Sequence, residues 1–97
     1  NAGVAYVRDF VDAVISGSVS LTTNAEIYFY GCNNDPIAQS LSSALGAIGR
    51  GDILVTGANN KVAPYPKLPA TVQVDHGGRF NTYSGGKLKS STKTLGY

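Results

Sequence analysis

Charged residues, cysteine and histidine are scarce in this sequence. Only 14% of its 97 residues are charged, whereas about a quarter are charged in an average globular protein. The single cysteine excludes a disulfide within the chain and a cysteine-based zinc cluster, and the single histidine offers no pair of imidazole ligands. No stretch reaches the roughly 18 apolar residues of a membrane-spanning helix. We therefore expect no metal ion, no cofactor and no membrane span.

Basic residues are few and are spread along the sequence. The net charge is +2, and a nucleic-acid binder needs a dense Lys and Arg face to contact phosphates. We therefore expect no nucleic-acid partner. Near the C-terminal end, Lys87, Lys89 and Lys93 have no acidic neighbour. We interpret this tail as a solvated, frayed terminus, and an anionic partner is the alternative.

The length of the chain suits one domain with a modest core, over residues 1–97. Methionine is absent and the first residue is Asn1, so we interpret the chain as a processed or excised part of a larger protein. Ser, Thr, Asn and Gly take the place of charged residues. That balance favours a secreted or surface-delivered bacterial protein.

The first half of the sequence has the pattern of a layered α/β unit. Apolar residues at helical spacing predict helices over residues 3–16 and 36–48, the second with Asp35 as its N-cap. Nearly continuous apolar runs predict buried strands over residues 25–32 and 52–57. A strand, a helix and a strand within about 30 residues form a βαβ unit with parallel strands.

The second half is richer in turns. Three prolines make residues 62–70 extended and irregular. Residues 71–74 and 79–83 alternate like strands, and we expect them to pair as a β-hairpin with its loop around residues 76–78. The predicted fold class is α/β, with a small parallel-type sheet, a βαβ unit, flanking helices and a C-terminal β-hairpin.

Cys32 is the strongest candidate for chemistry. It closes the first predicted strand and comes just before a helix, where sites form in parallel sheets. The positive end of a helix dipole favours the nucleophilic thiolate. The loop amides of Asn33 and Asn34 are candidate oxyanion donors. The alternative is a buried structural cysteine, because cysteine is among the most buried residue types.

His76 is the candidate general base, and Asp75 beside it could orient the imidazole. Asp75 and His76 also suit an exposed hairpin turn, and sequence spacing does not bring His76 to Cys32. Tyr65, in the proline-rich segment, is a candidate binding residue that could line a pocket. The other tyrosines are interpreted as core and rim residues.

Residues 25–33 read Ala-Glu-Ile-Tyr-Phe-Tyr-Gly-Cys-Asn and carry a family resemblance. They are similar to the strand that ends in the nucleophilic cysteine of caspase-like domains in bacterial secreted proteins and polymorphic toxins. The similarity continues through residues 37–41 and 52–58, and reaches a Gly-Arg-Phe stretch at residues 78–80. It spans about residues 4–86.

The resemblance implies that Cys32 is a peptidase nucleophile. The family's histidine lies in a His-Gly step before the helix that begins here near Val4, and this sequence has no histidine there. Three interpretations follow: either His76 takes the place of the family's histidine, or that histidine lies in a separate or missing segment, or the domain is inactive. The implied protein is a hydrolase of a bacterial effector or toxin that acts on a protein or peptide. The alternatives are a non-catalytic α/β module bound to a partner or immunity protein, and an effector enzyme of other chemistry.

Overall fold

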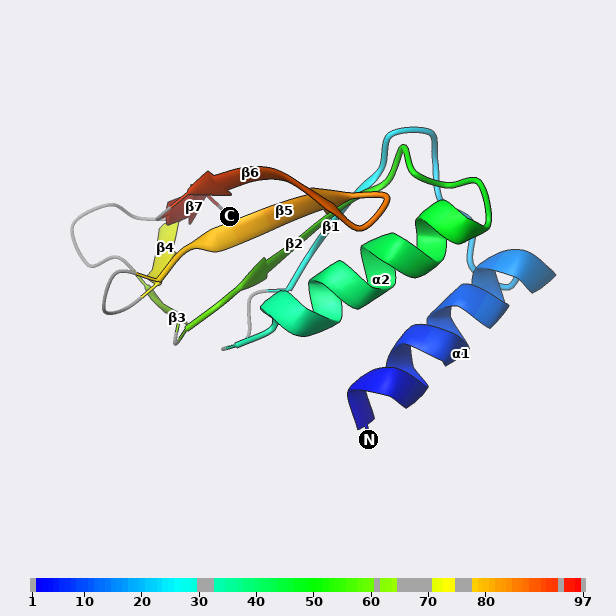
Figure 1. Ribbon diagram of the computed structural model, residues 1–97, viewed down its shortest axis with the longest axis horizontal. Coiled ribbons are helices and arrows are strands. Elements are labelled where there is room, and N and C mark those ends of the chain that lie inside the picture. The colour runs from blue at the N-terminus through cyan, green and yellow to red at the C-terminus, as the bar shows by residue number, and fades with distance from the viewer. Residues whose placement is uncertain are drawn as a thin grey trace.

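The computed structural model describes residues 2–29, 33–60, 62–64, 71–74, 78–92 and 94–96. Two helices come early in the chain and most strands follow (Figure 1). The elements in chain order are α1 (Ala2–Ser16), β1 (Glu26–Tyr28), α2 (Asp35–Ala47), β2 (Leu54–Ala58), β3 (Val62–Pro64), β4 (Thr71–Val74), β5 (Phe80–Ser84), β6 (Lys87–Thr92) and β7 (Thr94–Gly96). Neither described helix is long and apolar enough to cross a membrane.

The strands form two sheets. A four-stranded sheet has the order β1-β2-β5-β6, and a three-stranded sheet has the order β3-β4-β7. β1 and β2 run parallel and are joined through α2, whereas the other pairs are antiparallel. The predicted α/β class and its βαβ unit are therefore confirmed, within a sheet that is mixed rather than purely parallel.

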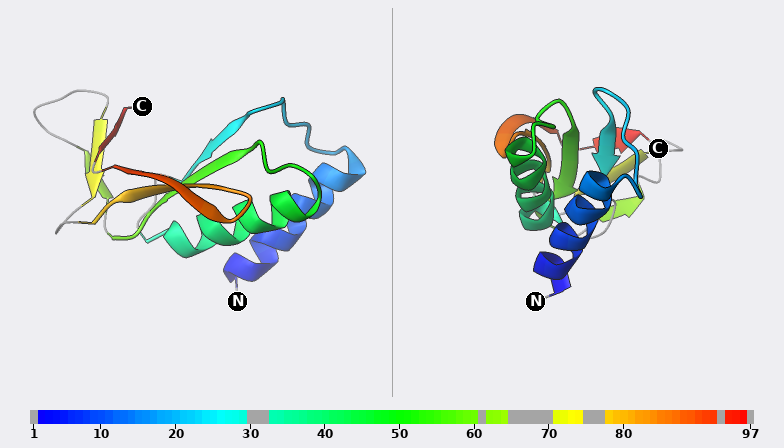
Figure 2. Two further views of the ribbon diagram at one scale, coloured as in Figure 1. Left: turned by 45° about the horizontal axis from the view of Figure 1, so that its top comes forward. Right: turned by 90° about the vertical axis from the view of Figure 1, so that its right-hand side faces the viewer.

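Both described helices lie on the same side of the four-stranded sheet (Figure 2). The core lies between α2 and this sheet, because α2 turns small and branched apolar side chains toward the strands. The buried members of this core cluster are Ala38, Leu41, Leu45, Ile53, Val55 and Tyr83. α1 packs beside α2 and adds half-buried side chains to the cluster, among them Val7, Phe10 and Val11.

β1 differs from the predicted interior strand. It spans three residues and lies at an edge of its sheet, and Glu26 and Tyr28 are exposed. Tyr28 donates a hydrogen bond from its hydroxyl to Glu26 Oε1 at 2.8 Å, while Ile27 and Phe29 pack against the core. The run is therefore amphipathic, and its aromatic residues make it look uniformly apolar in sequence. The interior position belongs to β2, in which residues 55–58 are buried.

A β-hairpin is present near the C-terminal end, but the two strands predicted to form it do not pair with each other. β4 and β5 occupy the two predicted strand positions, yet they lie in different sheets. β5 pairs instead with β6 across a turn at Gly85 and Gly86, whose φ angles are +58° and +84°. Two consecutive glycines in the left-handed region form a tight hairpin turn at low cost. Lys87 and Lys89 consequently lie in β6 and not in a frayed tail.

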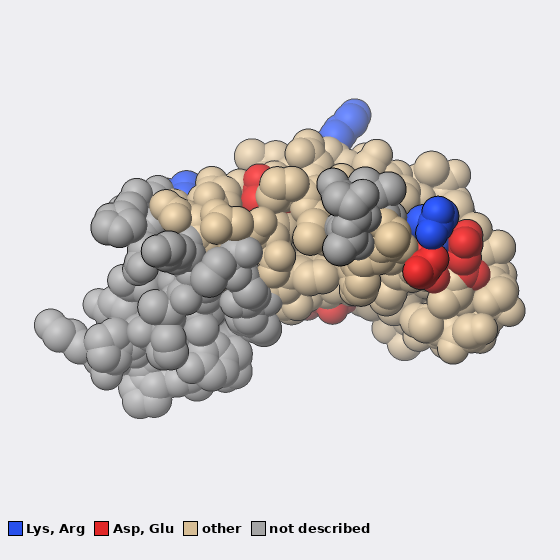
Figure 3. All heavy atoms as spheres, turned by 90° about the horizontal axis from the view of Figure 1, so that it is seen from below, with Lys and Arg blue, Asp and Glu red and all other residues tan. Residues whose placement is uncertain are grey.

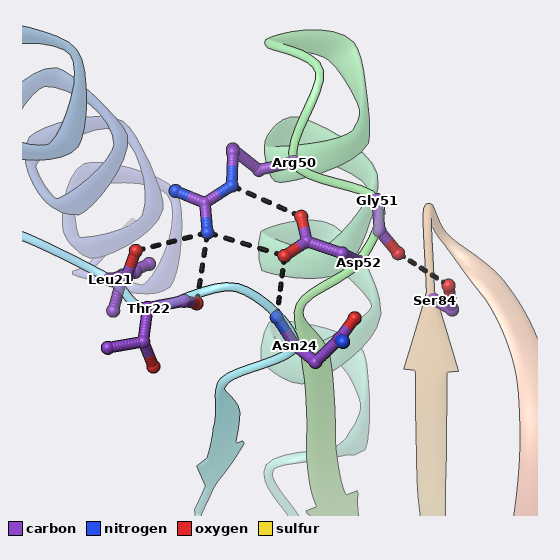
Figure 4. Close-up of polar contacts among 7 residues, drawn as sticks. All are labelled: Leu21, Thr22, Asn24, Arg50, Gly51, Asp52 and Ser84. Atoms are coloured by element: carbon purple, nitrogen blue, oxygen red, sulfur yellow. Dashed lines mark hydrogen bonds and ion pairs between the residues drawn. The ribbon is translucent and has the colours of Figure 1, made fainter.

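The connections at the amino ends of β1 and β2 are tied together by one ion pair (Figure 4). Arg50 donates from Nε to Asp52 Oδ1 at 3.1 Å, and its terminal nitrogen reaches the carbonyls of Leu21 and Thr22, each at 3.1 Å. The backbone N–H of Asn24 donates to Asp52 Oδ2 at 2.7 Å. The hydrogen bonds from Arg50 and Asn24 hold the pKa of Asp52 below its usual value.

Candidate functional site

The carboxyl ends of β1 and β2 lie beside the first turn of α2. Because β1 and β2 are parallel, both strands end on the same side of the sheet. The connection from β1 to α2 contains Cys32, one residue before Asn33 in sequence. Cys32 itself lies outside the described residues, as do the other predicted site residues Tyr65, Asp75 and His76.

Asn33 and Asn34 are the two predicted site residues that the structure describes. Asn33 has a φ of +57°, in the left-handed region that asparagine tolerates better than most residues. Its backbone N–H donates to the carbonyl of Asn60 at 3.1 Å. An oxyanion role for Asn33 would therefore require this hydrogen bond to open. Asn34 is the N-cap residue of α2, and its carbonyl accepts from the N–H of Ala38 at 2.9 Å.

Gly57 allows α2 to start very close to β2. A Cβ built on Gly57 would lie 2.6 Å from the carbonyl oxygen of Asn34 and 2.9 Å from Cβ of Ala38. Real Cβ atoms do not approach a carbonyl oxygen this closely, so any side chain would push the start of α2 away from the strand. The geometry of the Asn33 and Asn34 loop depends on this glycine, which the sequence marks only as a strand end.

Asp35 joins the first turn of α2 to the neighbouring strand β5. It was predicted as the N-cap, but it is the first residue of the helix. Its Oδ1 accepts hydrogen bonds from Nδ2 of Asn81 at 3.1 Å and from the hydroxyl of Tyr83 at 2.5 Å. Burial, together with the hydrogen bond and charge of Asp35, raises the pKa of Tyr83 to about 12. The phenol therefore remains a hydrogen-bond donor throughout the physiological pH range.

The same network continues outward to β6. Asn81 accepts from Oγ of Ser91 at 2.7 Å, and Ser91 in turn accepts from Nε of Arg79 at 2.7 Å. Sequence reasoning missed this set because it treated Asn81 and Tyr83 as ordinary residues of an alternating strand. The signal that was available is a polar Asn81 two positions from a core tyrosine, which places both on one face of the strand.

Aromatic rings flank the carboxyl end of β1. The ring of Tyr6 lies 5.8 Å from that of Phe29, in an edge-to-face arrangement, and 6.1 Å from that of Phe10. These contacts bring the early part of α1 next to the end of β1. Tyr6 is 43% exposed, as expected for a tyrosine at the rim of the core.

The described residues contain no metal-ligand cluster, and charged side chains are few on one face of the molecule. Among them, no three His, Cys, Asp or Glu side chains come together in a way that could hold a metal ion. On the face shown in Figure 3, charged side chains are sparse over the described surface.

No protein-family model, curated protein or solved structure matches this chain. The resemblance to caspase-like domains therefore stays a prediction, and the function must be argued from the residues themselves.

Proposed function

We propose that this chain is a cysteine-peptidase-like module of the caspase-like type, with Cys32 as its nucleophile. The observation that supports the proposal is the parallel pair of β1 and β2 linked through α2. In such a unit the connection that leaves the first strand lies outside the carboxyl ends of the strands, where ligands of open α/β sheets bind. Cys32 belongs to that connection in sequence.

The start of α2 favours the reactive form of this thiol. α2 spans 13 residues and has no basic residue in its last turn, and Asp35 is the acidic residue of its first turn. The partial positive charge at a helix N-terminus stabilises a nearby thiolate. Asp35 opposes this effect only in part, because its carboxylate is already bound by Asn81 and Tyr83.

The proposed reaction is acyl transfer through the sulfur of Cys32. A histidine, for which His76 is the candidate in this chain, takes the thiol proton while the sulfur attacks the carbonyl carbon of a peptide bond. The C–S bond forms as the carbonyl oxygen becomes an oxyanion, and collapse of this intermediate expels the amine with the proton from the imidazolium. Water then hydrolyses the thioester. Asn34 remains a candidate oxyanion donor, Asp75 a candidate orienting residue for His76, and Tyr65 a candidate binding residue.

The substrate class proposed is a protein or peptide, and the setting proposed is a bacterial secreted effector or toxin. The resemblance of residues 25–33 and the low charge content support this setting. The alternative function is a non-catalytic module that binds a partner or immunity protein.

Thiol reactivity tests the proposal, because the chain has one cysteine and every alkylation event therefore reports on Cys32. Iodoacetamide labelling near pH 7, followed by intact mass, should be about tenfold faster in the folded chain than in the chain unfolded by urea. A matched control is the double variant Cys32→Ala/Ser40→Cys. It moves the single thiol to an exposed position past the first turn of α2, where the dipole effect has faded.

The control thiol should react at about the rate of the unfolded chain. If folded Cys32 reacted more slowly than this control, it would be a buried structural cysteine. Hydrolysis of a fluorogenic peptide library should disappear in Cys32→Ala while the melting temperature changes little. Hydrolysis that persisted in Cys32→Ala would show that another group is the nucleophile.

A further inference from the structure

β6 forms an open edge of the four-stranded sheet. It is last in the strand order, and residues 87–90 are exposed. In a two-residue hairpin the residues on either side of the turn pair with each other, here Ser84 with Lys87. The N–H and C=O of the next residue, Leu88, then point away from β5. The edge therefore presents main-chain donors and acceptors that no other described strand pairs with.

Three positive side chains lie along this edge. Lys87 and Lys89 project from β6 itself, and Arg79 reaches β6 by donating to Oγ of Ser91 at 2.7 Å and to the Ser91 carbonyl at 3.0 Å. We name Arg79, Lys87 and Lys89 the basic edge. None of the three makes an ion pair with any acidic residue that the structure describes.

This lack of compensation sets the basic edge apart from the other described cations. Arg8 lies 3.6 Å from Asp9, and Arg50 lies 3.1 Å from Asp52. From residue 77 to residue 97 the sequence contains four basic residues and no acidic one. Within the described structure, no carboxylate balances the positive charge along β6.

We propose that the basic edge binds an extended acidic segment of a partner protein, which adds a strand to the sheet beside β6. Main-chain hydrogen bonds to an exposed strand edge supply affinity in this mode of recognition, and alternate side chains supply specificity. Lys87 and Leu88 point to opposite faces of the strand, and Leu88 is 59% exposed. β6 has a β-bulge at Lys89, because Leu88 pairs with Tyr83 and Ser90 with Thr82. The fitting segment therefore carries carboxylates on the Lys87 face and apolar side chains on the Leu88 face over the stretch of β6 before this bulge.

Other occupants fit the edge less well. A second copy of β6 would bring like charges together, which opposes strand pairing. Nucleic acids and anionic membranes would use the charge but not the unpaired main-chain groups, and three cations are few for phosphate binding. The proposal does not depend on Cys32, because it involves a different edge of the sheet from the one that β1 forms.

The test uses a fluorescein-labelled peptide of about eight residues that alternates Glu and Val. Fluorescence anisotropy should show saturable binding that weakens as salt is added. In ¹⁵N spectra the largest shifts should fall on the amides of residues 87–91. The double variant Lys87→Gln/Lys89→Gln should bind about fivefold more weakly, the size expected for two exposed ion pairs.

Two controls separate strand addition from simple charge attraction. A peptide of the same sequence with alternate backbone nitrogens methylated keeps its charge but cannot pair as a strand, and it should not bind. The variant Ser20→Asp/Thr23→Asp changes the net charge by the same two units at exposed positions before β1, and it should bind normally. Equal binding of the methylated peptide, or tighter binding of duplex DNA or phosphatidylserine vesicles, would overturn the proposal. So would an unchanged affinity in the Lys-to-Gln variant, or no peptide binding up to about 1 mM.

Discussion

The two ends of the four-stranded sheet are each secured by an aspartate, but in different ways. At the amino end, Asp52 pairs with Arg50 in a partly exposed ion pair that also holds the loop carbonyls of Leu21 and Thr22. At the carboxyl end, Asp35 is bound by the neutral donors Asn81 and Tyr83.

The amino end is therefore a connection between loops, in which the charge of Asp52 is balanced by its neighbour Arg50. The carboxyl end is a junction between a helix and two strands, and Gly57 and Asn34 are in tight contact there. A reactive site needs rigid support close by. The contacts of Gly57 and Asp35 hold the carboxyl end rigidly, whereas the amino end is held by an ion pair between two loops.

The largest difference in stability between the two ends of the sheet should come from replacing one glycine by alanine at each end. Gly57→Ala places a Cβ against the Asn34 carbonyl and should lower the free energy of unfolding by about 2 kcal/mol. Gly51→Ala, at the amino end, meets no atom within 4 Å and should change stability by less than about 0.5 kcal/mol. Urea unfolding of both variants measures the difference. Equal losses would show that the close contact at Gly57 does not limit the packing of α2.

Removing one hydroxyl tests the Asp35 network. Tyr83→Phe deletes the phenol that donates to Asp35 and should lower the free energy of unfolding by about 1.5 kcal/mol, because a partly buried carboxylate loses a donor. The matched control is Tyr6→Phe, since Tyr6 is 43% exposed and its change should stay below about 0.5 kcal/mol.

The same variant has a pH signature. Folding raises the pKa of Tyr83 from its usual value near 10 to about 12. The protonated phenol therefore adds stability that is fully present below about pH 10 and is lost as the pH rises toward 12. Unfolding measured across this range should show a smaller alkaline loss in Tyr83→Phe than in the natural chain. An identical alkaline slope in the two proteins would contradict the assignment to Tyr83.

The smallest effect is expected at the amino end. Arg50→Gln removes the charge that pairs with Asp52 and should lower the melting temperature by less than Tyr83→Phe does, because an ion pair that stays partly exposed to solvent contributes little. The difference in melting temperature between Arg50→Gln and the natural chain should become smaller at high salt, because salt screens the ion pair. A gap that is insensitive to salt would mean that the hydrogen bonds to Leu21 and Thr22 carry the effect.

Low pH should also reduce the difference in melting temperature between Arg50→Gln and the natural chain. The pKa of Asp52 is lower in the folded chain than its usual value of 3.8, so its ionised form adds stability above that pH. This contribution is lost as the pH falls through the lowered folded-state pKa. Thermal unfolding of Arg50→Gln and the natural chain should therefore converge below about pH 3.8, and parallel curves down to strongly acidic pH would contradict it.

Local patterns predicted much of the first half of the chain. The apolar spacing of residues 3–16 and 36–48 matches α1 and α2, and residues 52–57 match β2 closely. The consecutive glycines at 85 and 86 form the tight turn between β5 and β6. These features depend on contacts within a few residues, so the sequence contains them directly.

The candidate site was predicted less completely. Cys32, His76, Tyr65 and Asp75 remain predictions. The structure adds Asp35, which was predicted only as a helix N-cap, and Asn81 and Tyr83, which the patterns did not single out. An aspartate in front of a helix is readily interpreted as an N-cap from sequence. The hydrogen bonds that Asp35 accepts come from β5, which is distant in sequence, so local patterns do not predict them.

The sequence by itself determined where the helices and tight turns lie, because helical periodicity and paired glycines act over short distances. Only the tertiary structure decided that β1 is an edge, that β4 and β5 belong to different sheets, and that β6 forms the other edge of the mixed sheet. The physical reason is that strands choose partners through long-range hydrogen bonds and shared burial. The sequence pattern of a single strand does not identify the strand with which it will pair.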